Sequence, residues 1–261
     1  MVIEYSARSH VGKVRGSNED NLYVNGEFMP LQSRNRPFAM DGVTEAPCVF
    51  AVCDGMGGED CGEMAAYIAV EEMSHFQERL CAASGMQLST VVHDYVQEAD
   101  RAIRRIAGPG RNAGTTLAIV VVINRKVFCF SIGDTRIYAM KNGIFQQITN
   151  DHTWMAEKMQ LTRPLTDEVL RDNLHKITRC LGIGPAAVPD SYSPLTGRSR
   201  LLICSDGMTD MLSNRELEDI LTQRRPTSDA ADTLLSLALD KGGFDNTTLI
   251  VLDAVSPRRK K

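Results

Sequence analysis

The chain has 261 residues, a net charge of −4 and a hydrophobic content of 43%. This length and apolar content can bury a sizeable core in one large domain or two small ones. The net negative charge argues against a nucleic-acid-binding protein, since such proteins carry basic patches that match the phosphate backbone. The longest apolar run, Leu117 to Ile123, is far too short to span a membrane.

The N-terminal segment lacks the apolar stretch of a signal peptide, and the seven cysteines include no Cys-x-x-Cys pair. Reduced thiols of this kind are typical of cytoplasmic proteins. We therefore expect a cytoplasmic protein that binds neither membranes nor nucleic acid.

Short runs rich in β-branched residues predict most of the strands. These runs cover residues 21–24, 49–53, 116–123, 126–132, 136–140, 144–148, 201–204 and 247–252. Asn142-Gly143 lies between two of them and is a strong hairpin signal, and Asn124-Arg125 forms a second tight turn. Such short connections favour antiparallel pairing.

Helical spacing and capping signals predict helices between the strands. The predicted helices cover residues 62–76, 92–106, a segment after the Ser213/Glu216 capping box, and 227–239. Residues 25–47 look like a long surface excursion, and residues 150–184 look irregular, with weak helical pieces near Trp154 and Val169. Because the strands are joined by hairpins and no linker occurs, we predict an α+β fold with one domain, residues 1–255, and a solvated basic tail, 256–261.

Acidic residues stand at the ends of strands that are far apart in the sequence. These residues are Asp54, Asp134, Asp206 and Asp245, with Glu19 and Asp20 before the first short strand. An Asp-Gly pair after a strand is usually a hairpin turn. That explanation does not account for Asp54 and Asp206, because helix-forming stretches follow both of them. The set therefore indicates acids that converge on one face of the sheets.

Carboxylates packed together repel one another unless a cation neutralises them. Oxygen ligands without histidine or cysteine favour Mg²⁺, Mn²⁺ or Ca²⁺. Two such ions, about 3.5–4 Å apart, can share a hydroxide and orient it for attack on phosphorus. Arg15, close to the acids Glu19 and Asp20, is a candidate for binding the phosphate of a substrate.

With these motifs in their order, the chain resembles the metal-dependent protein phosphatase family (type 2C, PPM), and most closely its compact bacterial members. The matching stretches cover almost the whole chain. They are Arg15–Asp20, Asp54–Gly58 with Gly62-Glu63, Ala113–Thr116, Gly133–Arg136, Thr178-Arg179 with Leu181-Gly182, Ser205–Gly207 and Asp245–Thr248.

The resemblance implies a four-layer α-β-β-α sandwich, in which two antiparallel sheets stack between helices and the metals lie at one edge. It also implies that Asp54 bridges two core ions, Mn²⁺ or Mg²⁺. The carbonyl of Gly55 would bind one ion, and Asp206 and Asp245 would bind the other. Residues 150–184 fall where the family has its mobile flap.

The resemblance further assigns roles around the core ions. Glu19 and Asp20 would hold metal-bound waters, Asp134 would join Asp206 in binding a weaker third ion, and Arg15 would grip the phosphate. Met56 stands where many eukaryotic relatives have a histidine that is suspected of protonating the leaving group. Protonation of the leaving group by water is therefore expected here.

The implied function is hydrolysis of phosphoserine and phosphothreonine in proteins by direct attack of a hydroxide held between the metals. The expected partners are phosphorylated proteins, with a cognate serine/threonine kinase and its substrates, and the expected state is a monomer. Three alternatives remain open from the sequence. They are a silent pseudophosphatase that binds phosphoproteins, another two-metal hydrolase such as a nuclease, and a phosphatase of anti-anti-sigma factors.

Overall fold

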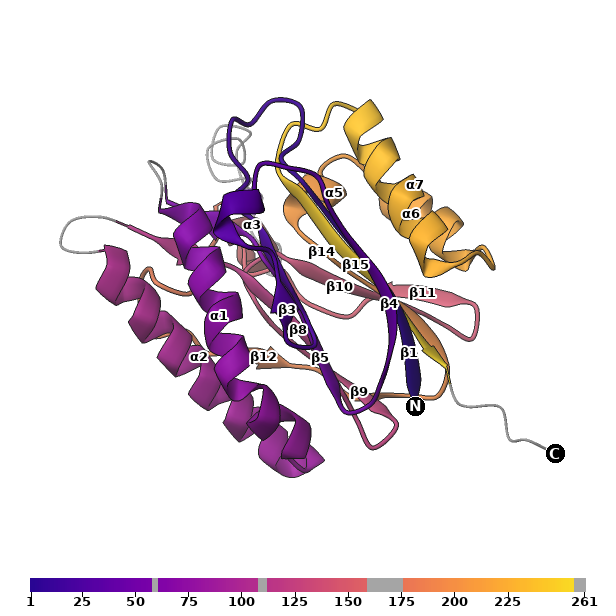
Figure 1. The fold of residues 1–261 in the computed structure, drawn as a ribbon, viewed down its shortest axis with the longest axis horizontal. Coiled ribbons are helices and arrows are strands. Elements are labelled where there is room, and N and C mark those ends of the chain that lie inside the picture. The colour runs from indigo at the N-terminus through magenta and orange to yellow at the C-terminus, as the bar shows by residue number, and fades with distance from the viewer. Residues whose placement is uncertain (58–60, 108–111, 159–175, 256–261) are drawn as a thin grey trace.

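The computed structural model describes residues 1–57, 61–107, 112–158 and 176–255. Figure 1 shows a layered arrangement, with α1 and α2 on one side, the strands in the middle, and α6 and α7 on the other side. This is the predicted α-β-β-α sandwich of antiparallel sheets. The predicted helical piece near Val169, Gly58 of the Asp54–Gly58 motif and the predicted tail lie outside the described residues.

One sheet carries both ends of the described chain. Its order is β11-β10-β14-β15-β1-β4, and every pairing is antiparallel. Its strands are β1 (Val2–His10), β4 (Phe38–Glu45), β10 (Arg136–Lys141), β11 (Ile144–Gln147), β14 (Ser199–Cys204) and β15 (Thr247–Val255). Asn142 and Gly143 both adopt positive φ, which gives β10 and β11 the predicted two-residue hairpin turn.

The second sheet has the order β12-β9-β8-β5-β2-β3, with β13 also paired to β9. Its strands are β2 (Asn21–Val24), β3 (Glu27–Phe28), β5 (Cys48–Cys53), β8 (Leu117–Ile123), β9 (Lys126–Ile132), β12 (Asp190–Ser191) and β13 (Leu195–Thr196). A separate small ladder pairs β6 (Gly55–Met56) with β7 (Gly114–Thr115). Strand β6 follows β5 in the chain, with Asp54 between them.

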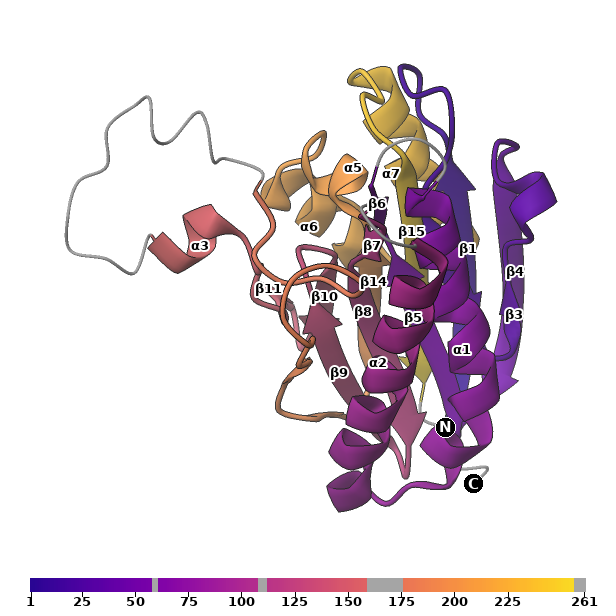
Figure 2. The same cartoon turned by 90° about the vertical axis from the view of Figure 1, so that its left-hand side faces the viewer.

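In the described part of the chain the helices lie outside the two sheets. They are α1 (Gly62–Ala82), α2 (Gly85–Ala107), α3 (Trp154–Lys158), α5 (Asp206–Thr209), α6 (Asn214–Thr222) and α7 (Thr227–Asp240), with the 3₁₀ turn η1 (Leu31–Ser33). The predicted capping box is present at α6: the Ser213 hydroxyl accepts from the Glu216 N–H, and the Glu216 carboxylate accepts from the Ser213 N–H. Figure 2 shows α3 set apart from the sheets. No described helix is long and apolar enough to cross a membrane.

Strand β5 explains why the core has layers. Its even-numbered residues, such as Phe50, pack between the two sheets, and its odd-numbered residues, such as Val49, pack against α1 and α2. Both faces are therefore apolar, so the strand reads as a continuous hydrophobic run rather than an alternating one. A third cluster packs α6 and α7 against the outer face of the first sheet.

Two expectations differ from the structure. Residues 25–47 are not a surface excursion: they hold β3, η1 and the eight-residue edge strand β4. The side chains of β4 alternate between half-buried and exposed, so its polar face and Gly42 concealed the strand signal. Strand β1 was not predicted, although it pairs with both β4 and β15 along its length. Its face toward α7 carries buried polar residues, Ser6 and Arg8, which contact Thr227 and Asp232, so the strand lacks a continuous apolar run.

Candidate functional site

The acids singled out in the sequence lie at one end of the strands, near β6, β7 and α5, which Figure 2 shows close together. The register of the strands places them there. Asp54 follows β5, Asp134 follows β9 by two positions, Asp206 begins α5 after β14, Asp245 precedes β15 by two positions, and Asp20 directly precedes β2. Antiparallel pairing aligns the ends of these strands.

Asp54 is held in place by two threonines. Its N–H donates to the Thr116 hydroxyl at 3.0 Å, and its carbonyl accepts from the Thr116 N–H and the Thr115 hydroxyl, each at 2.9 Å. The Thr116 hydroxyl also contacts the Thr135 hydroxyl, next to Asp134. The Thr115-Thr116 pair therefore fixes the backbone of Asp54 and ties it to the strand end that carries Asp134.

The Asp54 carboxyl group is the centre of the acidic cluster. Burial raises its pKa well above the usual value, and the charges of Asp206, Asp20 and Asp134 raise it further. Asp54 and Asp206 are also close enough for a side-chain hydrogen bond. Acids separated by more than a hundred positions in sequence thus share one small volume, where their charges oppose each other.

Asp20 lies deepest in this cluster, only 2% exposed. Burial raises its pKa to about 7, against the opposing effect of hydrogen bonds with Ser205 and Thr248. The Ser205 hydroxyl donates to Oδ2 of Asp20 at 2.8 Å, whereas Oδ1 is buried with no hydrogen-bond partner among the described residues. The unpartnered oxygen is suited to a water or a cation.

Asp134 has a similar environment. Burial, followed by the charge of Asp206, raises its pKa to about 7, and its Oδ1 is also buried with no hydrogen-bond partner in the described part of the chain. The preceding Gly133 has a φ of +94°, and its N–H donates to Nδ1 of His152 at 3.0 Å. His152 is 2% exposed and its backbone N–H donates to the Gly133 carbonyl, so it holds the turn before Asp134 in place.

Arg15 and Glu19 lie at the outer side of the cluster. Nη2 of Arg15 is 2.6 Å from Oδ2 of Asp245. This contact raises the pKa of Arg15, and the charges of Glu19 and Asp206 raise it further. The pKa of Glu19 is raised by burial and by the charge of Glu63, while Arg15 lowers it. The structure therefore brings Arg15, Glu19 and Asp245 together.

Gly55 and its neighbours are packed too closely for a side chain. A Cβ on Gly55 would overlap the carbonyl oxygens of Gly62 and Glu19, and a Cβ on Gly62 would overlap the Glu19 carboxylate. The start of α1 can therefore approach both Glu19 and the small ladder. This close approach explains why the sequence has glycine at both positions.

Asn246 supports the site, although its sequence position did not single it out. Its Oδ1 accepts from the Glu19 N–H at 2.7 Å, and its Nδ2 donates to the carbonyls of Val11 and Ser17, each at 2.9 Å. It thus joins the loop that carries Arg15 and Glu19 to the strand that follows Asp245. Its position next to Asp245, within the matching stretch Asp245–Thr248, was the signal in the sequence that could have identified it.

Buried hydroxyls form a second connection that the sequence analysis missed. The Ser9 hydroxyl contacts Thr248 Oγ1 at 2.7 Å and accepts from Asn18 Nδ2 at 2.9 Å. The Ser205 hydroxyl accepts from the Thr248 N–H while it donates to Asp20. These contacts place Asp20 against the ends of β14 and β15.

Divalent cations fit these residues. Within the described ranges, no group of three or more His, Cys, Asp or Glu side chains is already arranged as a metal cage. The acids nevertheless have mutually raised pKa values, and Asp20 and Asp134 each have a buried carboxyl oxygen that lacks a partner. A hard cation with oxygen ligands would neutralise the charge and take up those oxygens.

A family model described as protein phosphatase 2C matches residues 38–241. The chain belongs to the protein phosphatase 2C family. It is 30% identical to a serine/threonine phosphatase, stp, of Listeria welshimeri, with 94% of each chain covered. It is 29% identical to the protein phosphatase PhpP of Streptococcus pneumoniae, with 96% of this chain and 97% of that one covered.

A solved structure agrees with this 2C-family assignment. The catalytic domain of the serine/threonine protein phosphatase PstP, in complex with two manganese ions, superposes with a TM-score of 0.77 at 29% identity, covering 98% of this chain and 99% of that one. The predicted fold, enzyme class and cofactor, Mn²⁺ or Mg²⁺, are confirmed at this level. The chain is a metal-dependent phosphatase of phosphorylated proteins, and the comparisons do not support the pseudophosphatase alternative.

Proposed function

We propose that this 2C-family phosphatase hydrolyses phosphoserine and phosphothreonine at the acidic cluster around Asp54. The observation that carries this proposal is the shared charge environment of Asp54, Asp206, Asp20 and Asp134, four acids from separate strand ends. Asp54 and the Gly55 carbonyl would hold one core ion, and Asp54, Asp206 and Asp245 the other. Asp134 and Asp206 would hold a weaker third ion.

When bound, the divalent cations lower the pKa of water and neutralise charge on the phosphoryl group. The protein's own residues hold the acids and waters of the site in position. Thr115 and Thr116 fix the backbone of Asp54, and Ser205 orients Asp20 through Oδ2, leaving Oδ1 free to accept from a water. Glu19, whose pKa is raised by burial and by the charges of Glu63 and Asp245, would hold a second water.

Arg15 binds the phosphoryl group of the substrate in this proposal. Its guanidinium group is exposed and reaches the cluster at Asp245. A planar guanidinium can offer paired N–H donors to phosphoryl oxygens. Met56 cannot donate a proton, so the leaving serine or threonine oxygen takes its proton from water.

We also propose the cellular setting that the sequence suggests. The phosphatase would act as a cytoplasmic monomer that reverses a partner serine/threonine kinase. The cysteines, all of them free thiols, suit a reducing compartment. Residues 1–255 would form one catalytic domain, because β1 and β15 at its two ends pair along their whole length. Residues 150–184 would act as the flap, and 256–261 as a basic tail.

The test is the Asp206→Asn substitution. It removes one carboxylate charge from the cluster while keeping the size of the side chain. We expect it to abolish Mn²⁺-dependent hydrolysis of both p-nitrophenyl phosphate and a phosphothreonine peptide. Asp210→Asn, on the exposed surface a turn later in the chain, is the matched control and should keep its activity. Full activity of the Asp206→Asn enzyme would remove Asp206 from the site.

A further inference from the structure

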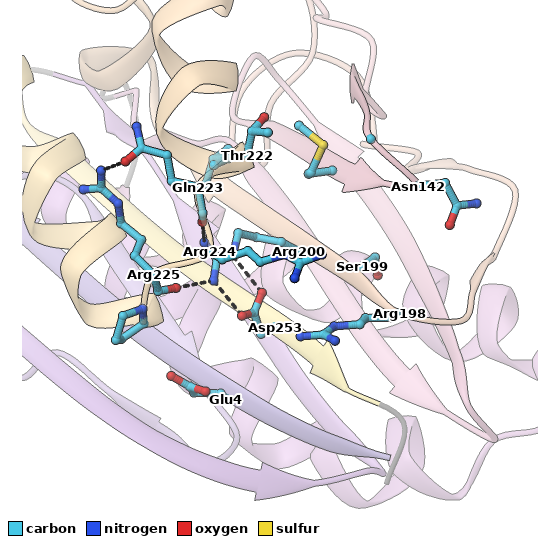
Figure 3. A pocket seen from close by; sticks show the side chains of 14 residues that line it. Glu4, Asn142, Arg198, Ser199, Arg200, Thr222, Gln223, Arg224, Arg225 and Asp253 are labelled. Carbon is cyan, nitrogen blue, oxygen red and sulfur yellow. Dashed lines mark hydrogen bonds and ion pairs between the residues drawn. The ribbon is translucent and has the colours of Figure 1, made fainter. Parts of the chain in front are cut away.

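A second polar pocket lies at the opposite end of the same sheet from the acidic cluster. It has a volume of about 610 Å³, and Figure 3 shows the residues that line it. Ser199 and Asp253 belong to it, and they stand at the far ends of β14 and β15 from Asp206 and Asp245. At roughly 3.3 Å per strand residue, some 20–25 Å separate the pocket from the acidic cluster.

Arg200 makes this pocket a built structure. Its guanidinium donates to both carboxylate oxygens of Asp253, at 2.8 and 2.7 Å, and to the carbonyls of Gln223 and Arg225, at 3.0 and 2.6 Å. Figure 3 shows these contacts joining the strands to the loop between α6 and α7. The loop is therefore held against the sheet by the backbone carbonyls of Gln223 and Arg225.

The remaining charge in the pocket is positive. The lining includes four arginines and two acids, Glu4 and Asp253, which leaves a net charge of +2. Asp253 is neutralised by Arg200, and Glu4 accepts from the N–H and hydroxyl of Thr227. Arg198 and Arg224 are exposed, and their side chains have no hydrogen bond or ion pair with any described residue.

The Ser199 hydroxyl is not one of the binding groups, because Ser199 pairs with Ala254 on the face of β14 between the two sheets, opposite to Arg200 and Asp253. Ser199 is 4% exposed, and its Oγ is buried with no hydrogen-bond partner among the residues that the structure describes. A ligand in the pocket therefore cannot reach this oxygen. The groups that remain for a ligand are the arginines, whose paired N–H donors recognise phosphoryl oxygens.

The size and lining of the pocket limit which kinds of ligand it can bind. Its volume falls in the range of small-ligand sites and far exceeds the needs of a lone phosphate ion. The lining has no aromatic side chain on which a nucleotide base could stack, and its apolar members are Met140, Leu221 and Pro226. A phosphorylated residue with its flanking peptide fits this chemistry better than a nucleotide does.

We propose that this pocket binds the phosphoryl group of a phosphorylated polypeptide segment through Arg198 and Arg224. It is a binding site separate from the acidic cluster, and it catalyses nothing. A polypeptide phosphorylated at more than one residue could then be held there while another phosphoresidue occupies the acidic cluster. The inference stands on the pocket's own residues and does not depend on the roles proposed for the acids.

The test measures binding without catalysis. The ¹⁵N-labelled full chain is titrated, with a chelator present, with a short phosphothreonine peptide, the same peptide unphosphorylated, and inorganic phosphate. We expect saturable shifts in the backbone amide signals of residues 199–200 and 222–225, strongest with the phosphopeptide and weaker with free phosphate. Since charge-assisted hydrogen bonds are the strong ones, the Arg198→Ala/Arg224→Ala double variant should weaken this binding about tenfold or more.

The controls separate this binding from general charge effects. Arg215→Ala removes an exposed arginine from nearby α6, outside the pocket, and should leave the affinity unchanged. Arg198→Lys/Arg224→Lys keeps the charge and should bind more weakly than the parent but better than the alanine pair.

Three results would overturn the proposal. They are no shifts at residues 199–200 and 222–225, equal binding of the unphosphorylated peptide, and binding of free phosphate without binding of the phosphopeptide. None of these results bears on hydrolysis. A loss of activity in Asp206→Asn would likewise leave this pocket's binding intact, so the two proposals fail separately.

Discussion

Nη2 of Arg15 lies 2.6 Å from Oδ2 of Asp245, although 230 positions separate the two residues in the sequence. The pair joins the residue proposed to bind phosphate to a residue proposed to bind metal. Asn246 enforces this proximity, because its side chain links the loop around Glu19 to the start of β15. A cation bound to Asp245 and a phosphoryl group bound to Arg15 would each replace one partner of this ion pair.

The Arg15→Ala substitution tests the phosphate-binding role. Loss of charge-assisted hydrogen bonds to the phosphoryl group should lower kcat/KM for a phosphothreonine peptide by about 10- to 100-fold. The Mn²⁺ concentration needed for half-maximal activity should fall or stay the same, because Arg15 no longer competes for Asp245. Steady-state kinetics at several Mn²⁺ concentrations measure both effects. An unchanged kcat/KM would contradict the role.

The Asn246→Ala substitution tests the positioning of the loop around Glu19. It removes one acceptor and two donors, and it leaves the carbonyls of Val11 and Ser17 and the Glu19 N–H without their partner. We expect a loss of about 2–4 kcal/mol in the free energy of unfolding, together with reduced activity. Urea denaturation measures the first. Asn150→Ala, at an exposed position, is the control, and equal stability of the two variants would refute the prediction.

The Thr116→Val substitution tests how Asp54 is held. Valine has the shape of threonine but lacks the hydroxyl that accepts from the Asp54 N–H and contacts Thr135. Leaving the buried N–H without a partner should cost about 1–3 kcal/mol of stability. Because Asp54 would also lose its fixed position, we expect a larger fall in kcat than in substrate affinity. A variant with normal stability and normal kcat would contradict this account.

The pKa values of Asp20 and Asp134 predict how the cation-free protein responds to pH. Burial raises both to about 7, above the ordinary value of 3.8. The folded state therefore binds these protons more tightly than the unfolded state does. Their stabilising contribution is complete below about pH 4 and is lost as pH rises toward 7. Stability in the presence of a chelator should accordingly fall between pH 5 and about 7.

Thermal unfolding with a chelator at several pH values measures this effect. Adding Mn²⁺ at pH 8 should restore the stability, because the cation replaces the protons. Asp134→Asn should flatten the pH dependence, since the amide carries no charge at any of these pH values. Stability that increases steadily from pH 5 to 7 in the chelated protein would show that these carboxyl groups are not raised as described.

The sequence predicted the parts of the fold that depend on local signals. The hairpin at Asn142-Gly143 needs only residues that tolerate positive φ, and β5 needs only a continuous apolar run. The edge strand β4 was missed because it is paired on one side and half exposed, which leaves a weak alternating pattern around Gly42. Strand β1 was missed because its face toward α7 is polar although it is buried, at Ser6 and Arg8.

The acids of the candidate site could be predicted from the sequence, whereas the residues that hold them in place could not. An acid directly beside a strand end can be recognised from its neighbours, as at Asp54 and Asp206. Asn246 and Ser205 act through contacts with residues about 185 or more positions away, namely Glu19 and Asp20. No local pattern encodes such contacts, so they appear only when the chain is folded.

We propose that acids remote in sequence meet to bind divalent cations. Anomalous scattering from crystals soaked in Mn²⁺ tests it most directly, because the measurement locates the ions and their ligands together. We expect two strong manganese peaks, with Asp54 touching both, the Gly55 carbonyl on one, and Asp206 and Asp245 on the other. Manganese peaks elsewhere on the protein, with no peak within bonding distance of Asp54, would contradict the claim.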